Sequence, residues 1–273
     1  MTTTSAEPLL VDHRDGVTTL TLNRPERLNA FNDDMILALG DQLELADRDQ
    51  DTRVVVLTGA GRGFCAGGDV GAQRERADRQ AERQGIDIEA RVERLVRGAT
   101  RTSVKLHRMS TPTIAAVNGP AAGAGLGLAL ACDLRLMSRS AVMTTAFARV
   151  GFAGDYGASW FMTNLVGTAV ARELFFTSSK VDAERALDLG LTNHVFDDEE
   201  FAGKVADYAA GLAHGPTLAF GYMKANLNRA LHHDLEDAIV SEAWGQARTG
   251  LSEDHREGAT AFAERRPPRF NGR

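Results

Sequence analysis

Cysteine, lysine and aromatic residues are scarce in this chain of 273 residues. Its two cysteines, Cys65 and Cys132, lie in apolar or glycine-rich runs without metal-ligand spacing. We expect both to be reduced, buried small side chains in a reducing compartment. Lysine occurs only at positions 105, 180, 204 and 224, so phosphate contacts are to be sought first among the arginines.

An excess of positive charge and long apolar runs are also absent. The net charge of -6 and the pI near 5.7 give no basic face for nucleic acid or an anionic membrane. No apolar run reaches the roughly 18 residues of a membrane span, and residues 1–8 lack a cationic stretch followed by an apolar one. The histidines are scattered without ligand spacing. We therefore expect a cytoplasmic protein with no metal and no nucleic-acid or membrane partner.

Hydropathy patterning predicts an α/β protein. Strands are expected at 17–22, 53–58, 113–117, 134–137 and 141–145, where residues alternate or form short apolar runs. A helix is expected at 33–47, further helices between 155 and 190, and helix throughout 201–265. No linker-like composition or internal repeat is visible, so we divide the chain into an α/β core, 1–200, and a helical region, 201–273.

The stretch 72–108 is rich in arginine and glutamate, with apolar residues at helical spacing towards its end. Because Gly85–Ile88 interrupts the pattern, two helical pieces are expected. This stretch is the predicted site of a mobile flap over a ligand.

Two glycine-rich loops each follow an apolar strand. Residues 61–66 satisfy G-x-G-x-x-A, the pattern of a dinucleotide site, but no acidic residue ends a second strand about 20 residues later. Read as Phe64-Cys-Ala-Gly-Gly-Asp69, the loop exposes backbone N–H groups that suit an anion or a developing oxyanion. Residues 118–127 repeat this arrangement, and two such loops are more specific than one. The alternative is a pair of tight strand-to-helix turns.

These segments resemble the crotonase, or enoyl-CoA hydratase/isomerase, superfamily. The resemblance rests on Arg24–Ala30, Phe64–Asp69, Ala116–Gly119, Ala129–Asp133 and Ala183–Leu191, in the family's order, and extends from about Leu20 to Phe270. It implies a crotonase-type spiral of repeated ββα units with a helical C-terminal trimerisation region, and a homotrimer or dimer of trimers. It also implies that the oxyanion-hole amides belong to Gly68 and Ala124.

Two departures from the hydratase pattern direct the choice of reaction. Hydratases of this family use two glutamates around a water, and the matching positions here are Gly127 and Phe147, which cannot move a proton. Isomerase-type relatives carry an aspartate where this chain has Asp155. One carboxylate suffices for double-bond migration. On sequence alone, Asp155 before Tyr-Gly-Ala-Ser also fits a helix N-cap, which is the alternative interpretation.

The resemblance further implies the residues that hold the substrate, an acyl-CoA thioester, with no other cofactor. Ala66, Phe147 and Tyr156 are expected at the acyl group. Coenzyme A is expected to contact Arg27 and Lys224 and, from a neighbouring subunit, Phe262 and Arg265. Phe147 in place of a glutamate favours an apolar, ring-bearing acyl group.

The leading hypothesis is an enoyl-CoA isomerase in which Asp155 shuttles a proton while Gly68 and Ala124 hold the enolate. A hydratase using Asp155 alone, an acyl-CoA hydrolase or dehalogenase, and a non-catalytic CoA-binding scaffold are the rivals. The dehalogenase of the family, a 4-chlorobenzoyl-CoA enzyme, is disfavoured because its tryptophan is Phe147 here and its histidine is replaced near Thr100.

Overall fold

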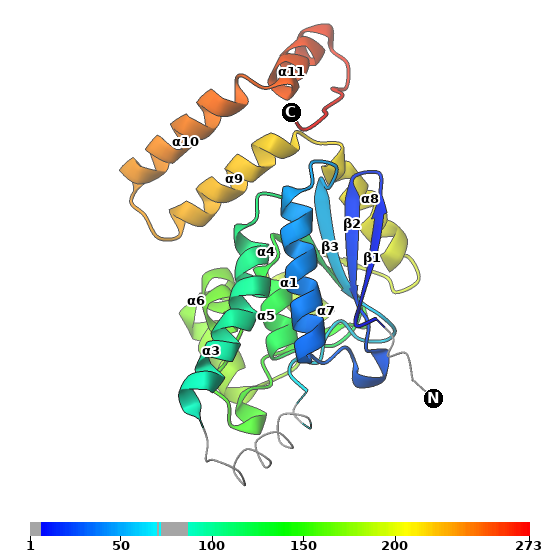
Figure 1. Ribbon diagram of the computed structural model, residues 1–273, viewed down its shortest axis with the longest axis vertical. Coiled ribbons are helices and arrows are strands. Elements are labelled where there is room, and N and C mark those ends of the chain that lie inside the picture. Colours follow the sequence, from blue (N-terminus) through cyan, green and yellow to red (C-terminus); the bar gives the residue numbers. More distant parts are fainter. Residues whose placement is uncertain (1–6, 70, 72–86) are drawn as a thin grey trace.

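The computed structural model describes residues 7–69, 71 and 87–273, and it confirms the predicted α/β class (Figure 1). Its main sheet has the strand order β1-β2-β3-β4-β6-β9. Only the first pair is antiparallel, and the later pairs are parallel. The strands are β1 (Leu9–Arg14), β2 (Val17–Leu22), β3 (Val54–Gly59), β4 (Thr113–Val117), β6 (Leu134–Ser138) and β9 (His194–Phe196).

A second, smaller sheet has the order β5-β7-β8. Its strands are β5 (Ala121–Ala122), β7 (Val142–Thr144) and β8 (Val181–Asp182). The chain passes from β4 to β5 and then into helix α5 (Ala124–Ala131), and later from β6 to β7 and into α6 (Ala158–Thr177). Two strands followed by a helix therefore recur, as the ββα spiral requires.

Both faces of the main sheet are buried. Alternate residues of β3 enter two separate apolar clusters, Val55 and Leu57 on one face and Val54 and Val56 on the other. The first cluster packs against α1 (Asp33–Arg48), α5 and α6. The other is closed by α8 (Phe201–Ala213), which presents buried residues at a spacing of four: Phe201, Val205, Ala209 and Ala213. α8 therefore packs with the core, whereas the predicted boundary at residue 200 assigns it to the helical region.

The helix after the undescribed segment runs without interruption from 88 to 108. α3 (Ile88–Ala99) continues through a π-helical turn, η2 (Thr100–Val104), into α4 (Lys105–Arg108). Asp87 caps its start by accepting a hydrogen bond from the Ala90 N–H at 2.9 Å. The first of the two predicted pieces, 72–84, lies outside the described residues, as does the part of the predicted flap up to residue 86.

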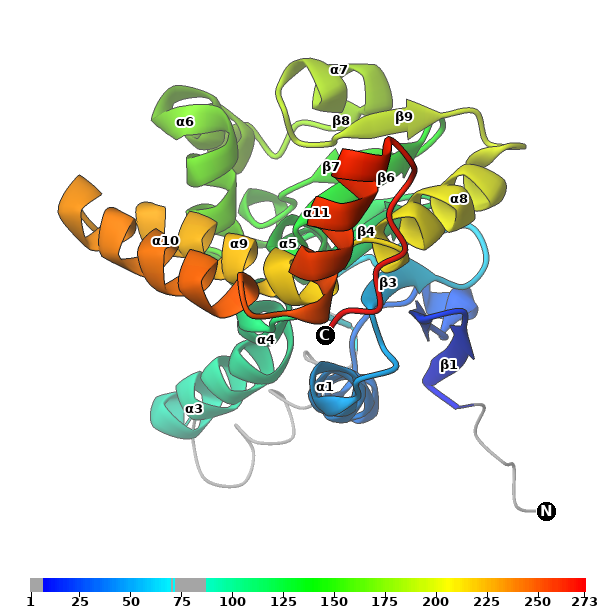
Figure 2. The same cartoon turned by 90° about the horizontal axis from the view of Figure 1, so that it is seen from above.

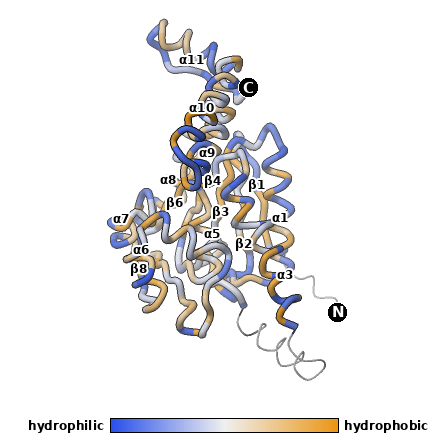
Figure 3. Tube along the Cα trace, turned by 90° about the vertical axis from the view of Figure 1, so that its left-hand side faces the viewer, coloured by the Kyte–Doolittle hydropathy of each residue, from blue (hydrophilic) through white to orange (hydrophobic). Residues whose placement is uncertain are grey.

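Short elements account for the remaining connections: η1 (Pro25–Arg27), η3 (Ala148–Val150) and α7 (Ala183–Asp188). In α6, Gly167 has φ 74° and ψ 169°, so the helix is broken there. This break divides the helical stretch that was predicted between 155 and 190. Along α1 the trace alternates between hydrophilic and hydrophobic colours, as expected for a helix covering a core (Figure 3). α3 also alternates, but its apolar side chains Ile88, Val92 and Val96 are exposed.

Helices α9 (Thr217–Ala230), α10 (Leu235–Thr249) and α11 (Glu253–Glu264) extend away from the sheet (Figures 1 and 2). α9 and α10 lie side by side, and their large apolar side chains face outward to an unusual extent. Those with more than half of their area exposed are Met223, Leu227, Leu235, Ile239, Val240, Trp244 and, in and before α11, Leu251 and Phe262. Phe270 lies against Gly258 of its own chain. No helix in the described ranges is long and apolar enough to cross a membrane.

Candidate active site

The two glycine-rich loops lie in contact at one edge of the main sheet. They follow β3 and β4, which are adjacent and parallel, so both loops begin at the carboxyl ends of their strands. The Cys65 N–H donates to the Pro120 carbonyl at 3.1 Å, and the Ala122 N–H donates to the Cys65 carbonyl at 2.9 Å. These bonds make a short parallel bridge that holds the loops together.

The N–H groups of Gly68 and Ala124 take no part in the hydrogen bonds between the two loops. The bonds flanking Gly68 run from the Phe31 N–H to the Gly67 carbonyl, 2.7 Å, and from the Asp69 N–H to the Phe31 carbonyl, 3.2 Å. Ala124 is the first residue of α5, where an N–H has no partner within the helix. In the described part of the chain no acceptor is recorded for either amide.

Gly67 explains how closely the loops approach. Its φ is 91°, and a Cβ there would lie 2.8 Å from the Ala122 carbonyl oxygen and 3.3 Å from the Ala124 nitrogen. Only glycine fits this position. Two adjacent, unpaired N–H groups, one of them at a helix N-terminus, suit an oxygen that gains negative charge.

Asp155 lies in a turn between η3 and α6, and it does not cap the helix. The N-cap of α6 is Gly157, which makes no side-chain capping bond. The Asp155 carbonyl accepts from the Ala158 N–H at 3.0 Å, while its side-chain Oδ1 is buried and has no hydrogen-bond partner among the described residues. The N-cap interpretation of this residue is therefore wrong.

Burial sets the protonation behaviour of this site. Loss of hydration raises the pKa of Asp155 to about 6. Burial also raises the pKa of the Cys65 thiol to about 12, and the nearby charge of Asp155 adds to that shift. Asp155 precedes Tyr156, which packs on Gly127 of α5. Gly125 of the same helix packs on Cys65, so Asp155 lies near the first loop. A carboxylate with a pKa near neutrality is suited to taking up and returning a proton at physiological pH.

The two hydratase-glutamate positions are occupied by other structure. A Cβ on Gly127 would lie 3.0 Å from the Cβ of Tyr156 and 3.1 Å from its carbonyl oxygen, so the Tyr156 backbone fills that space. Phe147 is buried and stacks on Phe175 with ring centroids 5.7 Å apart, next to Gly123. No carboxylate stands at either position, and the surface there is apolar.

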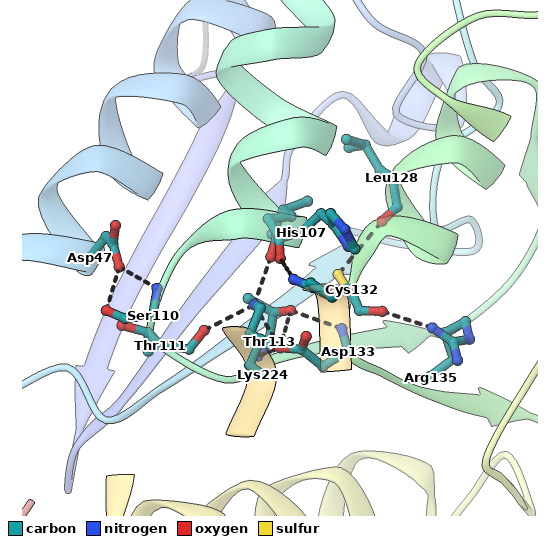
Figure 4. Close-up of polar contacts among 12 residues, drawn as sticks. Asp47, His107, Ser110, Thr111, Thr113, Leu128, Cys132, Asp133, Arg135 and Lys224 are labelled. Atoms are coloured by element: carbon teal, nitrogen blue, oxygen red, sulfur yellow. Dashed lines mark hydrogen bonds and ion pairs between the residues drawn. The ribbon is translucent and has the colours of Figure 1, made fainter. Parts of the chain in front are cut away.

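The structure corrects the expectation that Lys224 contacts coenzyme A. Its ammonium group is buried and donates to the Leu106 carbonyl at 2.8 Å, the Thr111 carbonyl at 3.3 Å and the Asp133 carboxylate at 2.8 Å (Figure 4). An ammonium group has three protons, and all three have acceptors within the chain. Lys224 therefore joins α9 to the core.

The other expected substrate residues are distributed as follows. Ala66 is half-buried in the first loop, where its N–H donates to the Leu28 carbonyl at 2.9 Å. Arg27 in η1 and Phe262 and Arg265 at the end of α11 are exposed. Sequence reasoning did not single out Asn29, which is fully buried and donates to the Ala60 and Gly63 carbonyls at 2.9 and 2.7 Å, tying the first turn to the first loop.

Titratable groups elsewhere do not form a metal site. Among residues 7–69, 71 and 87–273, no three histidine, cysteine, aspartate or glutamate side chains are grouped so as to hold a metal ion.

Sequence reasoning also did not single out Gly98 of α3. It borders Tyr156, and its only sequence signal was a glycine inside a helical pattern.

Comparison with known proteins gives consistent relatives. Residues 12–273 match the family model described as enoyl-CoA hydratase/isomerase. The chain is 40% identical over 258 residues to the 1,2-epoxyphenylacetyl-CoA isomerase of Escherichia coli K12, covering 94% of this chain and 96% of that protein. It is 32% identical to 4-chlorobenzoyl coenzyme A dehalogenase-1 of an Arthrobacter species, covering 89% and 85%. The solved enoyl-CoA hydratase of Bacillus anthracis superposes with a TM-score of 0.88 at 29% identity, covering 97% and 100%.

Proposed function

We propose that this chain, which belongs to the enoyl-CoA hydratase/isomerase family, is an acyl-CoA isomerase that uses Asp155 as its only proton carrier. The observation that carries the proposal is the buried Oδ1 of Asp155, which has no hydrogen-bond partner in the described chain and lies near the loop that contains Gly68. An unpaired buried carboxylate is costly to a fold, and such groups cluster at functional sites.

The proposed reaction moves a double bond by two proton transfers. The carboxylate of Asp155 removes a proton from C2 of a 3-enoyl-CoA, and the electron pair spreads over a dienolate whose thioester oxygen becomes negative. The amides of Gly68 and Ala124 donate hydrogen bonds to that oxygen. Each is worth about 2.7 to 4 kcal/mol of barrier by comparison with other oxyanion holes. The protonated Asp155 then returns the proton to C4, so that the 2-enoyl-CoA forms without gain or loss of atoms.

The acyl group is proposed to be apolar and to bear a ring. Phe147 lies next to Gly123 of the second loop and is buried beneath the partly exposed ring of Phe175, so the pair gives this end of the site an aromatic wall. The relative named 1,2-epoxyphenylacetyl-CoA isomerase supports the same choice, because the thioester in its name bears a six-membered carbon ring. Ala66 is proposed to border the acyl group. Tyr156 was expected there too, but its ring packs on Phe31 and its hydroxyl reaches Gly98 of α3.

Coenzyme A and subunit contacts remain proposals that follow from the family. Arg27, Phe262 and Arg265 are exposed and available to phosphate and adenine groups. The outward apolar side chains of α9 and α10 are proposed to be covered in a homotrimer or a dimer of trimers. The tip of α11 would then bring Phe262 and Arg265 to a neighbouring subunit.

The decisive experiment follows 3-enoyl-CoA and 1,2-epoxyphenylacetyl-CoA in deuterated water with wild type and Asp155→Asn. Ultraviolet absorbance reports the conjugated product, and mass spectrometry reports deuterium and water. We expect isomerisation without added water, and deuterium at C2 or C4 in so far as the proton on Asp155 exchanges with the solvent before it is returned. A positioned acid–base group contributes about 10² to 10⁴ in rate, so Asp155→Asn should lower kcat by that factor.

Each rival predicts a different result. Addition of water to a 2-enoyl-CoA would indicate the hydratase, and release of free coenzyme A would indicate a hydrolase. Chloride release from 4-chlorobenzoyl-CoA would indicate the dehalogenase. CoA binding without exchange or turnover, unchanged in Asp155→Asn, would contradict an isomerase and indicate the scaffold.

A further inference from the structure

The turn that carries Asp155 has an unusual backbone. Gly151, Gly154 and Gly157 have φ values of 71°, 126° and 75°, and Tyr156 among them has φ 48°. The left-handed region is open to glycine but costs a residue with a side chain about 1 kcal/mol or more. Such a conformation persists only where the surroundings enforce it. Something other than local preference must therefore hold Tyr156.

The side chain of Tyr156 supplies that restraint by filling a slot between two helices. Its ring lies against Phe31 with centroids 5.4 Å apart. Its hydroxyl reaches α3 at Gly98, where a Cβ would lie only 2.9 Å from the phenolic oxygen but 3.7 Å from the ring carbon Cζ. On α5, a Cβ on Gly127 would meet the Cβ and the carbonyl oxygen of Tyr156 at 3.0 and 3.1 Å.

The two glycines thus create the slot, each in a different way. Gly98 leaves space for the hydroxyl group at the end of the ring. Gly127 leaves space for the backbone and the first carbon of the side chain. Tyr156 is 6% exposed, so there is no free volume into which it can retreat without moving the turn.

Asp155 depends on this slot because, among the described residues, no hydrogen bond directs Oδ1 of its carboxylate. The backbone carbonyl of Asp155 accepts a hydrogen bond from the Ala158 N–H, which holds the backbone and not the side chain. The direction of the side chain is therefore set by the backbone that Tyr156 fixes.

We infer that Tyr156 is a positioning residue that aims Asp155 at the substrate, and that Gly98 and Gly127 form the slot that holds it. The inference rests on the proposed function and deepens it. It also explains the glycine at position 127, because a glutamate there and the Asp155 turn would occupy the same space.

A double-mutant cycle tests the slot. Gly98→Ala places a methyl group 2.9 Å from the phenolic oxygen, and Tyr156→Phe removes that oxygen. A 1 Å misplacement of a catalytic group can lower a rate about 10²-fold, so we expect Gly98→Ala to lower kcat roughly tenfold or more. In the Tyr156→Phe background the same change should lower kcat less than about twofold, a coupling that only contacting residues show.

Gly127→Ala is the matched control. Its methyl group meets the Cβ and carbonyl oxygen of Tyr156, which Tyr156→Phe retains. We therefore expect Gly127→Ala to lower kcat in both backgrounds by the same factor. Rescue of both alanine variants, or of neither, would overturn the inference.

Two further readouts separate positioning from general damage. The KM for the acyl-CoA and the urea midpoint should change little in Gly98→Ala, because we expect this variant to keep the folded core and the two loops. The acid limb of the kcat–pH profile should move to lower pH, since a displaced Asp155 gains hydration. A fall in kcat that is matched by a lower urea midpoint, with an unmoved acid limb, would overturn the inference. If Asp155→Asn retains wild-type kcat, the proposed function fails instead, whatever the cycle shows.

Discussion

The buried carboxylate of Asp155 destabilises the folded protein whenever it is ionised. Its pKa is about 6 in the folded chain and near the ordinary value of 3.8 when the chain unfolds, with burial as the cause. The folded state therefore holds the proton more tightly, so the free energy of unfolding decreases as pH rises from about 4 to about 6 and stays lower above. Two pKa units correspond to about 3 kcal/mol.

Asp155→Asn should accordingly stabilise the protein while abolishing its proposed chemistry. We expect a gain of up to about 3 kcal/mol at pH 8 and about half of that at pH 5, where part of the wild-type carboxyl group is already protonated. Urea unfolding at the two pH values measures the difference. Asp188→Asn, at an exposed carboxylate of α7, is the control and should change neither value. An equal gain at both pH values would contradict this account of Asp155.

Lys224 gives the opposite prediction, since its charge is fully partnered. Lys224→Met removes the lysine donor from the Leu106 and Thr111 carbonyls and the cation from the Asp133 carboxylate. Among the described residues, the carboxylate keeps only the hydrogen bonds from the Thr113 N–H and hydroxyl. Loss of one member of such a buried group costs about 3 kcal/mol, which urea unfolding would detect. Lys204→Met, at an exposed lysine of α8, should be neutral. An unchanged unfolding curve with a raised KM for acyl-CoA would return Lys224 to the substrate site.

At the scale of elements, the close approach of α5 to the Asp155 turn leaves little room for a glutamate at position 127. Gly127→Glu restores a family glutamate, but its Cβ would collide with Tyr156 at 3.0 Å. We expect no hydration of 2-enoyl-CoA, at least a tenfold lower isomerase kcat, and a destabilisation of about 1 to 3 kcal/mol from overpacking. Gly203→Glu in α8, where a Cβ meets nothing within 4 Å, is the control. Efficient water addition by Gly127→Glu would show that the turn can yield.

The same elements show what sequence could and could not predict. The long apolar strands β3 and β4 and the helix α1 were predicted, because their periodicity reflects burial that any sheet of this class imposes. The short strands β5 and β8 were missed, since a two-residue pairing depends on partners distant in sequence.

The candidate site divides in a similar way. The positions of Gly68 and Ala124 followed from two loop patterns and a resemblance, and the structure brings those loops together. The N-cap interpretation of Asp155 failed because Tyr156 and Gly157 take left-handed conformations, which place the helix start two residues later than a cap at 155 would require. That backbone is set by tertiary contacts with Gly98 and Gly127, which no local pattern contains.

At the scale of the whole molecule, α9 and α10 expose more apolar surface than an isolated chain would keep in water. We expect the purified protein to sediment as a trimer or hexamer. Ile239→Glu, in the middle of α10, should shift it towards monomer because an unpaired charge would be buried at a subunit contact. Phe176→Glu, at an exposed position of α6, should leave the mass unchanged. A monomeric wild type would contradict the proposed assembly.

The low reactivity of the two thiols is useful for labelling experiments. Burial raises the pKa of both Cys65 and Cys132 to about 12, so almost no thiolate is present near neutral pH. A maleimide dye or spin label will therefore react with a cysteine introduced at the surface and pass over the native ones. Distances between labels on helices α9–α11 and labels on the core can therefore be measured in the natural sequence. Cys65, which lies close to Asp155, does not have to be replaced first.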